Sequence, residues 1–328
     1  MSKGIAVVGN VFVDIKGFPF GAYIPAGRNA GEIKTVHGGV GRNLVEDIAN
    51  MELRPVFVST VDDSAEGREV IAKLKRHKTN TDYVLPVKDG MGIWLAIFDE
   101  TGDVAGSISK RPDMEPLRKL IDTKGDEIFS DCDSIVLEID LDKEIAKSVL
   151  GFAAKYGKKV YAVVANITIA AERRDLIKEV DCIICNRQEA GLLFVEEYEN
   201  LGPDEMREAL ASKIKDAGFK AMVVTMGADG SVYADASGSS GVCPARAVAV
   251  CDTTVAGDAF GAGVAAGLTY GCSMDEAMNI GTRIAASVIV SDENVCPRFL
   301  PTELGINPEN TARKSGKSLY FGDEDIEK

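Results

Sequence analysis

The sequence predicts an α/β fold in which a mostly parallel sheet is flanked by helices and a small β-rich lid projects from it. Short apolar runs alternate with amphipathic stretches, a pattern typical of a parallel sheet covered on both faces. Two stretches break this alternation, and we assign them to the lid. The predicted strands are residues 4–9, 56–60, 134–139, 159–164, 182–185 and 221–226, and the predicted helices are residues 64–77, 142–156, 187–198 and 204–217.

The two segments that break the alternation predict the lid. Residues 11–36 are rich in glycine, proline and aromatic residues. Residues 92–98 and 103–109 flank Asp99-Glu100-Thr101-Gly102, which predicts a hairpin. After Pro301 the chain becomes polar. The expected parts are an α/β core at 1–10, 37–90 and 110–301, a β-lid at 11–36 and 91–109, and a polar C-terminal tail at 302–328.

Composition narrows the class of protein. The 51 acidic residues outnumber the 37 basic ones, which gives a formal net charge of −14. This charge argues against nucleic-acid polymers and anionic membranes as partners. A small phosphorylated ligand stays possible, because helix N-termini bind anions without a net positive charge. The first residues show no signal-peptide pattern and no apolar run approaches the ~20 residues of a membrane span, so we expect a cytoplasmic protein.

Cysteine and histidine usage narrows the chemistry. Seven cysteines are scattered along the chain, which predicts reduced thiols rather than a disulfide framework. Cys182 and Cys185 form a lone C-x-x-C inside an apolar run, and this favours buried strand cysteines over a zinc site. Because the chain has only two histidines, acid–base chemistry is expected to fall to carboxylates.

Polar residues just after the predicted strands are candidates for a site, because ligands of open α/β sheets bind beyond the carboxyl ends of the strands. Asn10 and Asp14 follow the first strand. Asp14 either accepts two hydrogen bonds from sugar hydroxyls or serves as a turn residue that bonds its own backbone. Glu138 lies at the end of the strand at 134–139.

The run VHGGVGRN ends just before a helix predicted to begin at Leu44. Gly38 and Gly39 allow backbone to approach a ligand, and Asn43 can both donate to and accept from hydroxyls. Arg42 is either a substrate or phosphate contact or a surface side chain. The run lacks the G-x-x-x-x-G-K-[ST] of a P-loop and the G-x-G-x-x-G of a dinucleotide site.

Two further strand ends carry polar motifs. Asn186 and Glu189 form N-x-x-E after the strand at 182–185. They either hold the water shell of Mg²⁺ or form an N-terminal capping box. The glycine-containing turn after the strand at 221–226 either lines nucleotide phosphates or is an ordinary tight turn. Its candidate residues are Thr225, Gly227 and Gly230.

Asp258 lies in CDTTVAGDAFGAG, near the predicted start of a helix. If the helix begins near residues 255–256, the amides of its first turn are free and form an anion site. A phosphoryl group held there would lie within reach of a hydroxyl that is hydrogen-bonded to Asp258. Phosphoryl transfer asks mainly for alignment, charge stabilisation and a proton acceptor. The alternative is that Asp258 only complements the helix dipole.

In this order, the motifs resemble those of the PfkB, or ribokinase-like, family of carbohydrate and nucleoside kinases over roughly residues 4–300. The resemblance is carried by GG-x-G-x-N from Gly38, N-x-x-E from Asn186, T-x-G-x-x-G from Thr225 and D-T-x-x-A-G-D from Asp252. It implies an α/β sandwich with a β-lid over the substrate. It also implies ATP-dependent phosphorylation of a primary hydroxyl on a small nucleoside or sugar.

The resemblance assigns roles to particular residues. The catalytic base would be Asp258, and the anion hole would be the backbone amides of Val255, Ala256, Gly257 and Asp258. The substrate would contact Asn10, Asp14, Gly38, Gly39, Arg42, Asn43 and Glu138. ATP would contact Asn186, Thr225, Gly227 and Gly230. Mg²⁺ would be held through water by Asn186 and Glu189, and a monovalent cation such as K⁺ by Asp252 and Thr254.

The sequence also indicates which molecule accepts the phosphoryl group. GGVGRN, the preceding AGEIK and the later SDENVCPRFLP are similar to the pseudouridine kinase branch of the family, which favours the 5′-hydroxyl of pseudouridine. The alternatives are another nucleoside or a free sugar of the ribose or fructose type. Lid-bearing kinases of this family often pair through their lids, and Trp94, Ile97 and Phe98 in the lid hairpin predict a homodimer.

Val255 departs from the family signature, which usually reads G-A-G-D. A β-branched residue tolerates positive φ poorly, at a cost of ~1–2 kcal/mol if that conformation is required. A second hypothesis is therefore a catalytically weak sensor that binds sugar or nucleoside. A nicotinamide dehydrogenase is disfavoured, because its glycine fingerprint is absent from the sequence.

Overall fold

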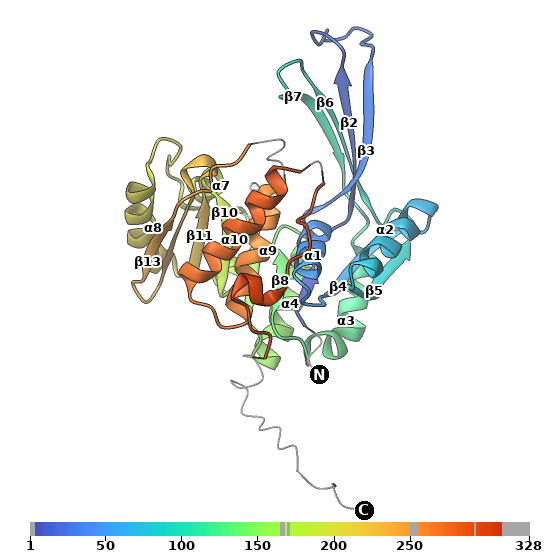
Figure 1. The fold of residues 1–328 in the computed structure, drawn as a ribbon. Coiled ribbons are helices and arrows are strands. Elements are labelled where there is room, and N and C mark those ends of the chain that lie inside the picture. The colour runs from blue at the N-terminus through green and yellow to red at the C-terminus, as the bar shows by residue number, and fades with distance from the viewer. Residues whose placement is uncertain (1–3, 165–167, 169–170, 250–254, 292, 310–328) are drawn as a thin grey trace, which may run out of the picture.

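The predicted mostly parallel sheet, flanked by helices and accompanied by a small β-rich sheet, is confirmed in the computed structural model (Figure 1). The structure describes residues 4–164, 168, 171–249, 255–291 and 293–309. Within these residues, one sheet has nine strands and the other has four. In spatial order the larger sheet consists of β13 (Ser240–Cys243), β12 (Ser231–Asp235), β11 (Ala221–Thr225), β10 (Cys182–Asn186), β9 (Val160–Val163), β8 (Ile135–Glu138), β1 (Ala6–Val8), β4 (Val56–Asp62) and β5 (Asn80–Val87).

The strands from β11 to β5 run parallel, and β12 and β13 add an antiparallel edge. Val7 of the interior strand β1 lies between Phe57 of β4 and Val136 of β8. Parallel strands present their carboxyl ends at one edge of the sheet. The segments that follow β1, β8, β10 and β11 therefore gather at the same edge.

Helices cover both faces of the larger sheet, because side chains alternate between the faces along each buried strand. Val7 belongs to one apolar core, and Ala6 and Val8 belong to the other. The first core also contains side chains of α1 (Val40–Asn50), α2 (Ala65–Arg76), α9 (Ala256–Thr269) and α10 (Met274–Ile289). The second contains side chains of α3 (Glu115–Phe129), α4 (Lys143–Tyr156), α6 (Arg174–Ile177), α7 (Arg187–Phe194) and α8 (Pro203–Ala217).

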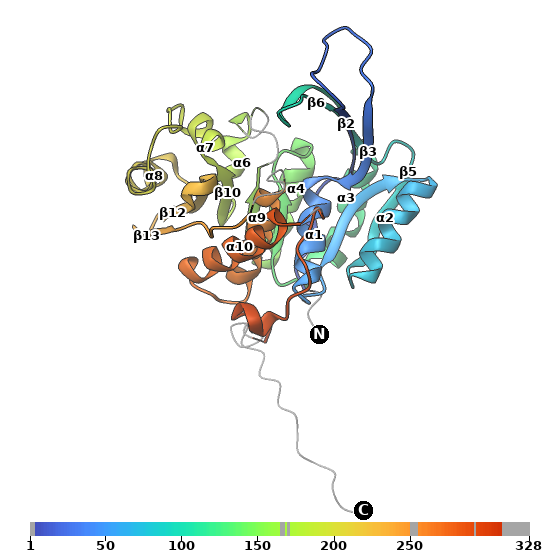
Figure 2. The same ribbon diagram turned by 45° about the horizontal axis from the view of Figure 1, so that its top comes forward.

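The four-stranded sheet projects from the end of the molecule where the parallel strands terminate (Figures 1 and 2). Its spatial order is β3 (Gly31–Gly38), β2 (Phe12–Pro19), β6 (Gly92–Phe98) and β7 (Val104–Lys110). β2 and β6 are parallel, whereas the β2–β3 and β6–β7 pairs are antiparallel. The division of the chain into core, lid and tail at the expected boundaries stays a prediction.

Local structure differs from the sequence expectation at two functional positions. Asp14 lies within β2, opposite Val36 and Trp94, so it is not a turn residue. α1 begins at Val40, four residues before the expected start at Leu44. Gly39 has a φ of 95°, a conformation that suits glycine and lets this single residue connect β3 to the helix.

The cysteine prediction is confirmed for the described thiols. Six cysteines are free, and Cys182 and Cys185 are buried in β10. The short 3-10 turns are η1 (Gly227–Asp229) and η2 (Pro301–Leu304). None of the described helices combines the length and apolar character needed to cross a membrane.

Candidate functional site

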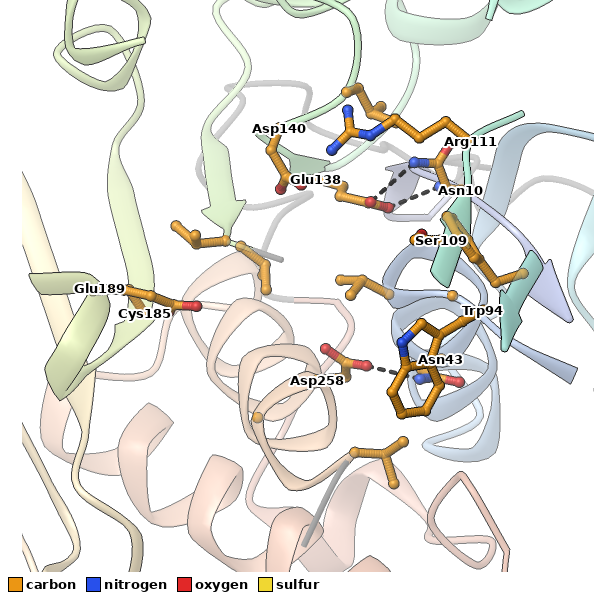
Figure 3. A pocket seen from close by; sticks show the side chains of 18 of the residues that line it. Asn10, Asn43, Trp94, Ser109, Arg111, Glu138, Asp140, Cys185, Glu189 and Asp258 are labelled. Atoms are coloured by element: carbon orange, nitrogen blue, oxygen red, sulfur yellow. Dashed lines mark hydrogen bonds between the residues drawn. The ribbon is translucent and has the colours of Figure 1, made fainter. Parts of the chain in front are cut away.

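A cavity of about 510 Å³ lies at the carboxyl ends of the parallel strands, between them and the smaller sheet (Figure 3). The structure brings most of the sequence-predicted site residues to its wall, and they come from both sheets and from the starts of three helices. These residues are Asn10, Asp14, Gly39, Asn43, Glu138, Asn186, Glu189, Thr225, Val255, Gly257 and Asp258. Five others do not line it, namely Gly38, Arg42, Ala256, Gly227 and Gly230, and Asp252 and Thr254 lie outside the described residues.

Asp258 lies in the first turn of α9 and faces this cavity (Figure 3). The helix starts at Ala256, as predicted, and no side chain caps it. Its first intrahelical bond runs from the amide of Ala259 to the carbonyl of Val255, so the amides before Ala259 make no bond inside the helix. Asp258 therefore lies beside amides that make no bond within the helix, and its place in the first turn also lets it complement the helix dipole, the alternative that the sequence left open.

Asn43 joins Asp258 across the two helices. Its Nδ2 donates a 2.7 Å hydrogen bond to Asp258 Oδ2, and its own Oδ1 is buried without a partner among the described residues. Burial raises the pKa of Asp258 to about 6, and the charges of Asp14 and Asp140 raise it as well. The bond from Asn43 and the charge of Arg42 act in the opposite direction.

The backbone conformation of Val255 does not require the positive φ that a β-branched residue disfavours. Val255 has a φ of −104° and a ψ of 5°. This conformation lies outside the left-handed region, so the expected cost of a positive φ does not arise. Val255 can enter the α9 turn as the N-terminal flanking residue without strain of that kind.

Glu138 holds the glycine run in place. Its Oε2 accepts hydrogen bonds from the backbone amides of Asn10 (2.8 Å) and Gly41 (3.2 Å), and its Oε1 accepts one from Asn10 Nδ2 (3.1 Å). A Cβ on Gly41 would come within 2.5 Å of backbone atoms of Gly9, so this approach requires glycine. Burial and the charge of Asp140 raise the pKa of Glu138, while the bonds from Asn10 lower it.

Arg42 is neither at the surface nor at the cavity wall. It is 1% exposed, because its Nη1 pairs with Glu46 Oε2 at 2.5 Å and its Nη2 donates to the carbonyl of His37. The surface alternative is therefore wrong, and the protein-lined cavity gives the guanidinium no direct access to a ligand. Its place one turn from Glu46 on α1 explains the burial, since each charge neutralises the other.

Asn186 and Glu189 form the capping box that the sequence left open as an alternative. The amide of Glu189 donates to Asn186 Oδ1 (2.8 Å), and the amide of Asn186 donates to Glu189 Oε2 (2.7 Å). Glu189 Oε1 takes no part in the box. Burial raises the pKa of Glu189 to about 7. Among the described residues, no three His, Cys, Asp or Glu side chains come close enough to hold a metal ion by themselves.

Thr225 ends β11 at the cavity, and the residues after it form a tight turn, one of the two interpretations that the sequence left open. The carbonyl of Gly230 accepts a 2.8 Å bond from the amide of Met226, and Gly227 and Gly230 have φ values of 61° and 93°. Asp14 faces the cavity from β2, and burial raises its pKa.

Several wall residues were not predicted as site residues from the sequence. The smaller sheet and the segment after it supply Phe12, Trp94, Ser109 and Arg111, and the β8 end supplies Asp140. The alternation of side chains along a strand could have predicted part of this set. Asp14, Trp94 and Ser109 lie opposite one another on adjacent strands and share one face of the smaller sheet.

The fold and the family are shown by comparison with known proteins. A solved structure titled as an Arabidopsis thaliana ribokinase with ribose and ATP matches with a TM-score of 0.78 at 21% identity, over 93% of this chain and 99% of that one. Residues 2–301 match the pfkB family of carbohydrate kinases, so the chain belongs to that family and is a sugar or nucleoside kinase.

Two curated relatives bear on the substrate. A guanosine-inosine kinase of Exiguobacterium acetylicum is 34% identical over 294 residues, which cover 88% of this chain and 95% of that protein. A pseudouridine kinase of Escherichia coli (strain K12) is 25% identical over 262 residues, with coverages of 80% and 82%.

Proposed function

We propose that the protein transfers the γ-phosphoryl group of ATP to a primary hydroxyl of a nucleoside, the 5′-hydroxyl of its ribose. The observation that carries this proposal is the position of Asp258. Its carboxylate faces a cavity of about 510 Å³ directly beside the amides that begin α9, which make no bond within the helix. Amides and dipole of a helix N-terminus stabilise the charge of a phosphoryl group.

Asp258 acts as the general base. A hydroxyl that attacks phosphorus must lose its proton, and a carboxylate with a pKa of about 6 is mostly ionised at pH 7 and can accept it. Asn43 holds this carboxylate through one oxygen, which leaves the other oxygen for the hydroxyl. The unpartnered Oδ1 of Asn43 is placed to accept a bond from a second hydroxyl of the substrate.

The other polar residues of the cavity wall bind the sugar hydroxyls. Asp14 and Gly39 offer a carboxylate and a backbone group from the lid side. Asn10 and Glu138 line the cavity as well, although Glu138 already accepts three protein hydrogen bonds, so it contributes mainly by fixing Asn10 and Gly41. Gly38 and Arg42 act indirectly, because neither lines the cavity. A Cβ at position 38 would collide with the carboxylate of Asp14, and Arg42 connects the His37 carbonyl to α1 through a hydrogen bond.

The proposed ATP and Mg²⁺ sites lie toward β10 and β11. Thr225 and Asn186 would contact the nucleotide at the cavity wall, and Gly227 and Gly230 would extend the site along the turn after β11. The donor set fits Mg²⁺, because the carboxylates of Glu189 and Asp140 face the cavity and Mg²⁺ prefers oxygen ligands while keeping several waters. Held there, Mg²⁺ would neutralise phosphate charge. A K⁺ site at Asp252 and Thr254 stays part of the proposal. ATP use is in keeping with the cytoplasmic location expected from the sequence.

A purine nucleoside is a better candidate for the acceptor than the pseudouridine expected from the sequence. The support is the higher identity to the relative named guanosine-inosine kinase, 34% against 25%. Pseudouridine and free ribose stay as alternatives. The sensor hypothesis rested on strain at Val255, and a φ of −104° removes that reason.

The proposal includes a homodimer that pairs through the lid. Asp14, Trp94 and Ser109 line the cavity from one face of the smaller sheet. On the opposite face, four apolar side chains are exposed among the described residues. They adjoin across the strands, with Leu95 opposite Ile108 and with Ile97 and Ile33 on either side of Gly17. The exposed side chains are Ile33 (74%), Leu95 (40%), Ile97 (37%) and Ile108 (71%).

The decisive experiment is ADP release by the wild type and by Asp258→Asn, with inosine, guanosine, pseudouridine and ribose as acceptors. We expect the substitution to lower kcat by about 10²- to 10⁴-fold, the usual contribution of a general base. Acceptor-induced thermal stabilisation should persist in the variant. Asp204→Asn, whose side chain is 87% exposed, is the matched control and should retain full activity. Wild-type ADP release by Asp258→Asn would overturn the proposed base.

A further inference from the structure

The lid side of the cavity carries three residues of different chemistry in succession. Trp94 of β6 lies directly opposite Ser109 of β7, and Arg111 follows two residues later; all three line the cavity. Figure 3 shows the guanidinium of Arg111 reaching across the cavity on the side of Asp140, with Ser109 between it and Trp94. An aromatic surface, a hydroxyl and a guanidinium thus line the same cavity.

The ring of Trp94 is held by its aromatic neighbours. It meets Phe98 edge-to-face at a centroid distance of 6.4 Å, and Phe98 stacks on Phe18 at 4.7 Å. Edge-to-face packing of this kind restricts the ring and leaves a fixed aromatic surface toward the cavity. A planar base binds such a surface by stacking, with about 1–3 kcal/mol per base in nucleic-acid complexes.

Arg111 is a cation without a hydrogen bond or an ion pair among the described residues. By contrast, nearby Arg173 donates to the carbonyls of Ile139 and Leu141. Lys110, the neighbour of Arg111 in the chain, pairs with Asp89 at 2.5 Å. The five donors of Arg111 are therefore available to a ligand.

We propose that Trp94, Ser109 and Arg111 form a nucleobase subsite that selects 6-oxopurine nucleosides, an inference that rests on the proposed nucleoside kinase function. Arginine donates two parallel hydrogen bonds to the O6 and N7 acceptors of a 6-oxopurine. Adenine presents an N6 donor where the oxopurine has the O6 acceptor. The guanidinium would therefore face another donor at this position and lose one of its two hydrogen bonds. The hydroxyl of Ser109 donates or accepts and adjusts to either edge.

The test compares inosine with adenosine, which differ in the group at position 6. We expect the wild type to favour inosine in kcat/KM by at least about tenfold, since a good bidentate pair discriminates by about 1–3 kcal/mol. Arg111→Gln should lower this ratio by about tenfold to a hundredfold, because glutamine matches N6 and N7 of adenine. The ratio of kcat/KM for inosine to kcat/KM for ribose should fall as well, because ribose carries no base for Arg111 to bind.

Lys110→Gln is the matched control, because it removes a positive charge one residue away, outside the cavity wall. It should leave the ratio as in the wild type. An Arg111→Gln ratio equal to the wild-type ratio overturns the subsite, as does a uniform loss with all acceptors and a raised KM for ATP, which would assign the guanidinium to phosphate. Wild-type preference for adenosine overturns it as well.

Equilibrium binding separates this inference from the proposed function. Inosine and adenosine affinities are measured by calorimetry without ATP, for the wild type and for Arg111→Gln. If no acceptor is phosphorylated but inosine binds more tightly in an Arg111-dependent way, the kinase proposal fails and the subsite stands. If turnover occurs without base discrimination in either measurement, the subsite fails and the kinase proposal stands.

Discussion

Asn43 Nδ2 donates a 2.7 Å hydrogen bond to Asp258 Oδ2, and this bond connects the first turns of α1 and α9 across the cavity. The two residues are 215 positions apart in the chain. The bond favours the ionised form of Asp258, whereas burial favours the protonated form. The balance of the two sets the pH at which the proposed base works.

The first prediction concerns this balance. Asp258 must be ionised to accept a proton, so activity should fall as the pH drops through about 6. Asn43→Ala removes the donor, which raises the pKa of Asp258 and moves the acid limb of the kcat/KM profile up by about one pH unit. Asn10→Ala is the control, since Asn10 bonds Glu138 instead and should change KM without moving the limb. An unmoved limb in Asn43→Ala would contradict the assignment.

The second prediction concerns the buried pair of Arg42 and Glu46. The two side chains are 1% and 0% exposed and lie 2.5 Å apart. Removing one partner leaves a buried charge without compensation, so Glu46→Gln should lower the free energy of unfolding by about 3–5 kcal/mol. The double variant Arg42→Met/Glu46→Leu should recover most of this loss. Urea unfolding of the single and double variants measures both effects, and additive losses would refute a coupled pair.

The burial of Arg42 could not be predicted from the sequence. Its type and its place after GGVG pointed to a ligand contact or to solvent, and neither holds. Burial depends on Glu46 one turn later and on Lys73, 3.4 Å from Glu46 on another helix. The second of these contacts exists only after α1 and α2 pack. In the same way, no local pattern predicts that Asn43 meets Asp258.

The main elements were more predictable, because each carries its own periodicity. Strand β10 and helices α2, α4 and α8 lie close to their expected bounds. Three elements, β5, α3 and α10, were not predicted from the sequence. β5 is an edge strand that contains Pro86, which is tolerated only at edges and weakens a strand pattern. α10 carried an unused signal, the capping box between Ser273 and Glu276.

The third prediction concerns Asp47, which is fully buried on α1. Its Oδ1 accepts a 2.7 Å bond from the amide of Cys296, and its Oδ2 has no partner among the described residues. Burial raises the pKa of Asp47 to about 7. The folded state therefore binds this proton more tightly than the unfolded state, whose aspartate has a pKa of about 3.9. Stability is lost as the pH rises from about 4 through 7.

Asp47→Asn removes this titration and keeps an oxygen for the Cys296 amide. We expect the substitution to stabilise the protein at pH 8 by on the order of 2 kcal/mol and to have little effect at pH 4. Urea unfolding at both pH values measures the difference. A gain of equal size at the two pH values would show that Asp47 is not the titrating group.

The fourth prediction uses Trp94, the single tryptophan of the chain. Its emission reports on the cavity wall without interference from another indole. If a nucleobase stacks on Trp94, inosine should quench the emission in a saturable way, whereas ribose should leave it unchanged. Titration of the wild type with both acceptors tests this, and a matching response to ribose would show that closure of the lid, rather than stacking, changes the signal.

The fifth prediction concerns the apolar face of the smaller sheet that points away from the cavity. Ile33 and Ile108 are 74% and 71% exposed on this face. Exposed apolar patches of this kind mark interfaces, and a lysine placed in a paired face would be desolvated without a partner. Ile108→Lys should therefore convert a dimer into a monomer in light scattering. Leu192→Lys is the matched control, because Leu192 is 50% exposed on α7, far from this sheet in the chain, and should leave the mass unchanged. A wild-type monomer, or a dimer that survives Ile108→Lys, would show that the apolar face is not the interface.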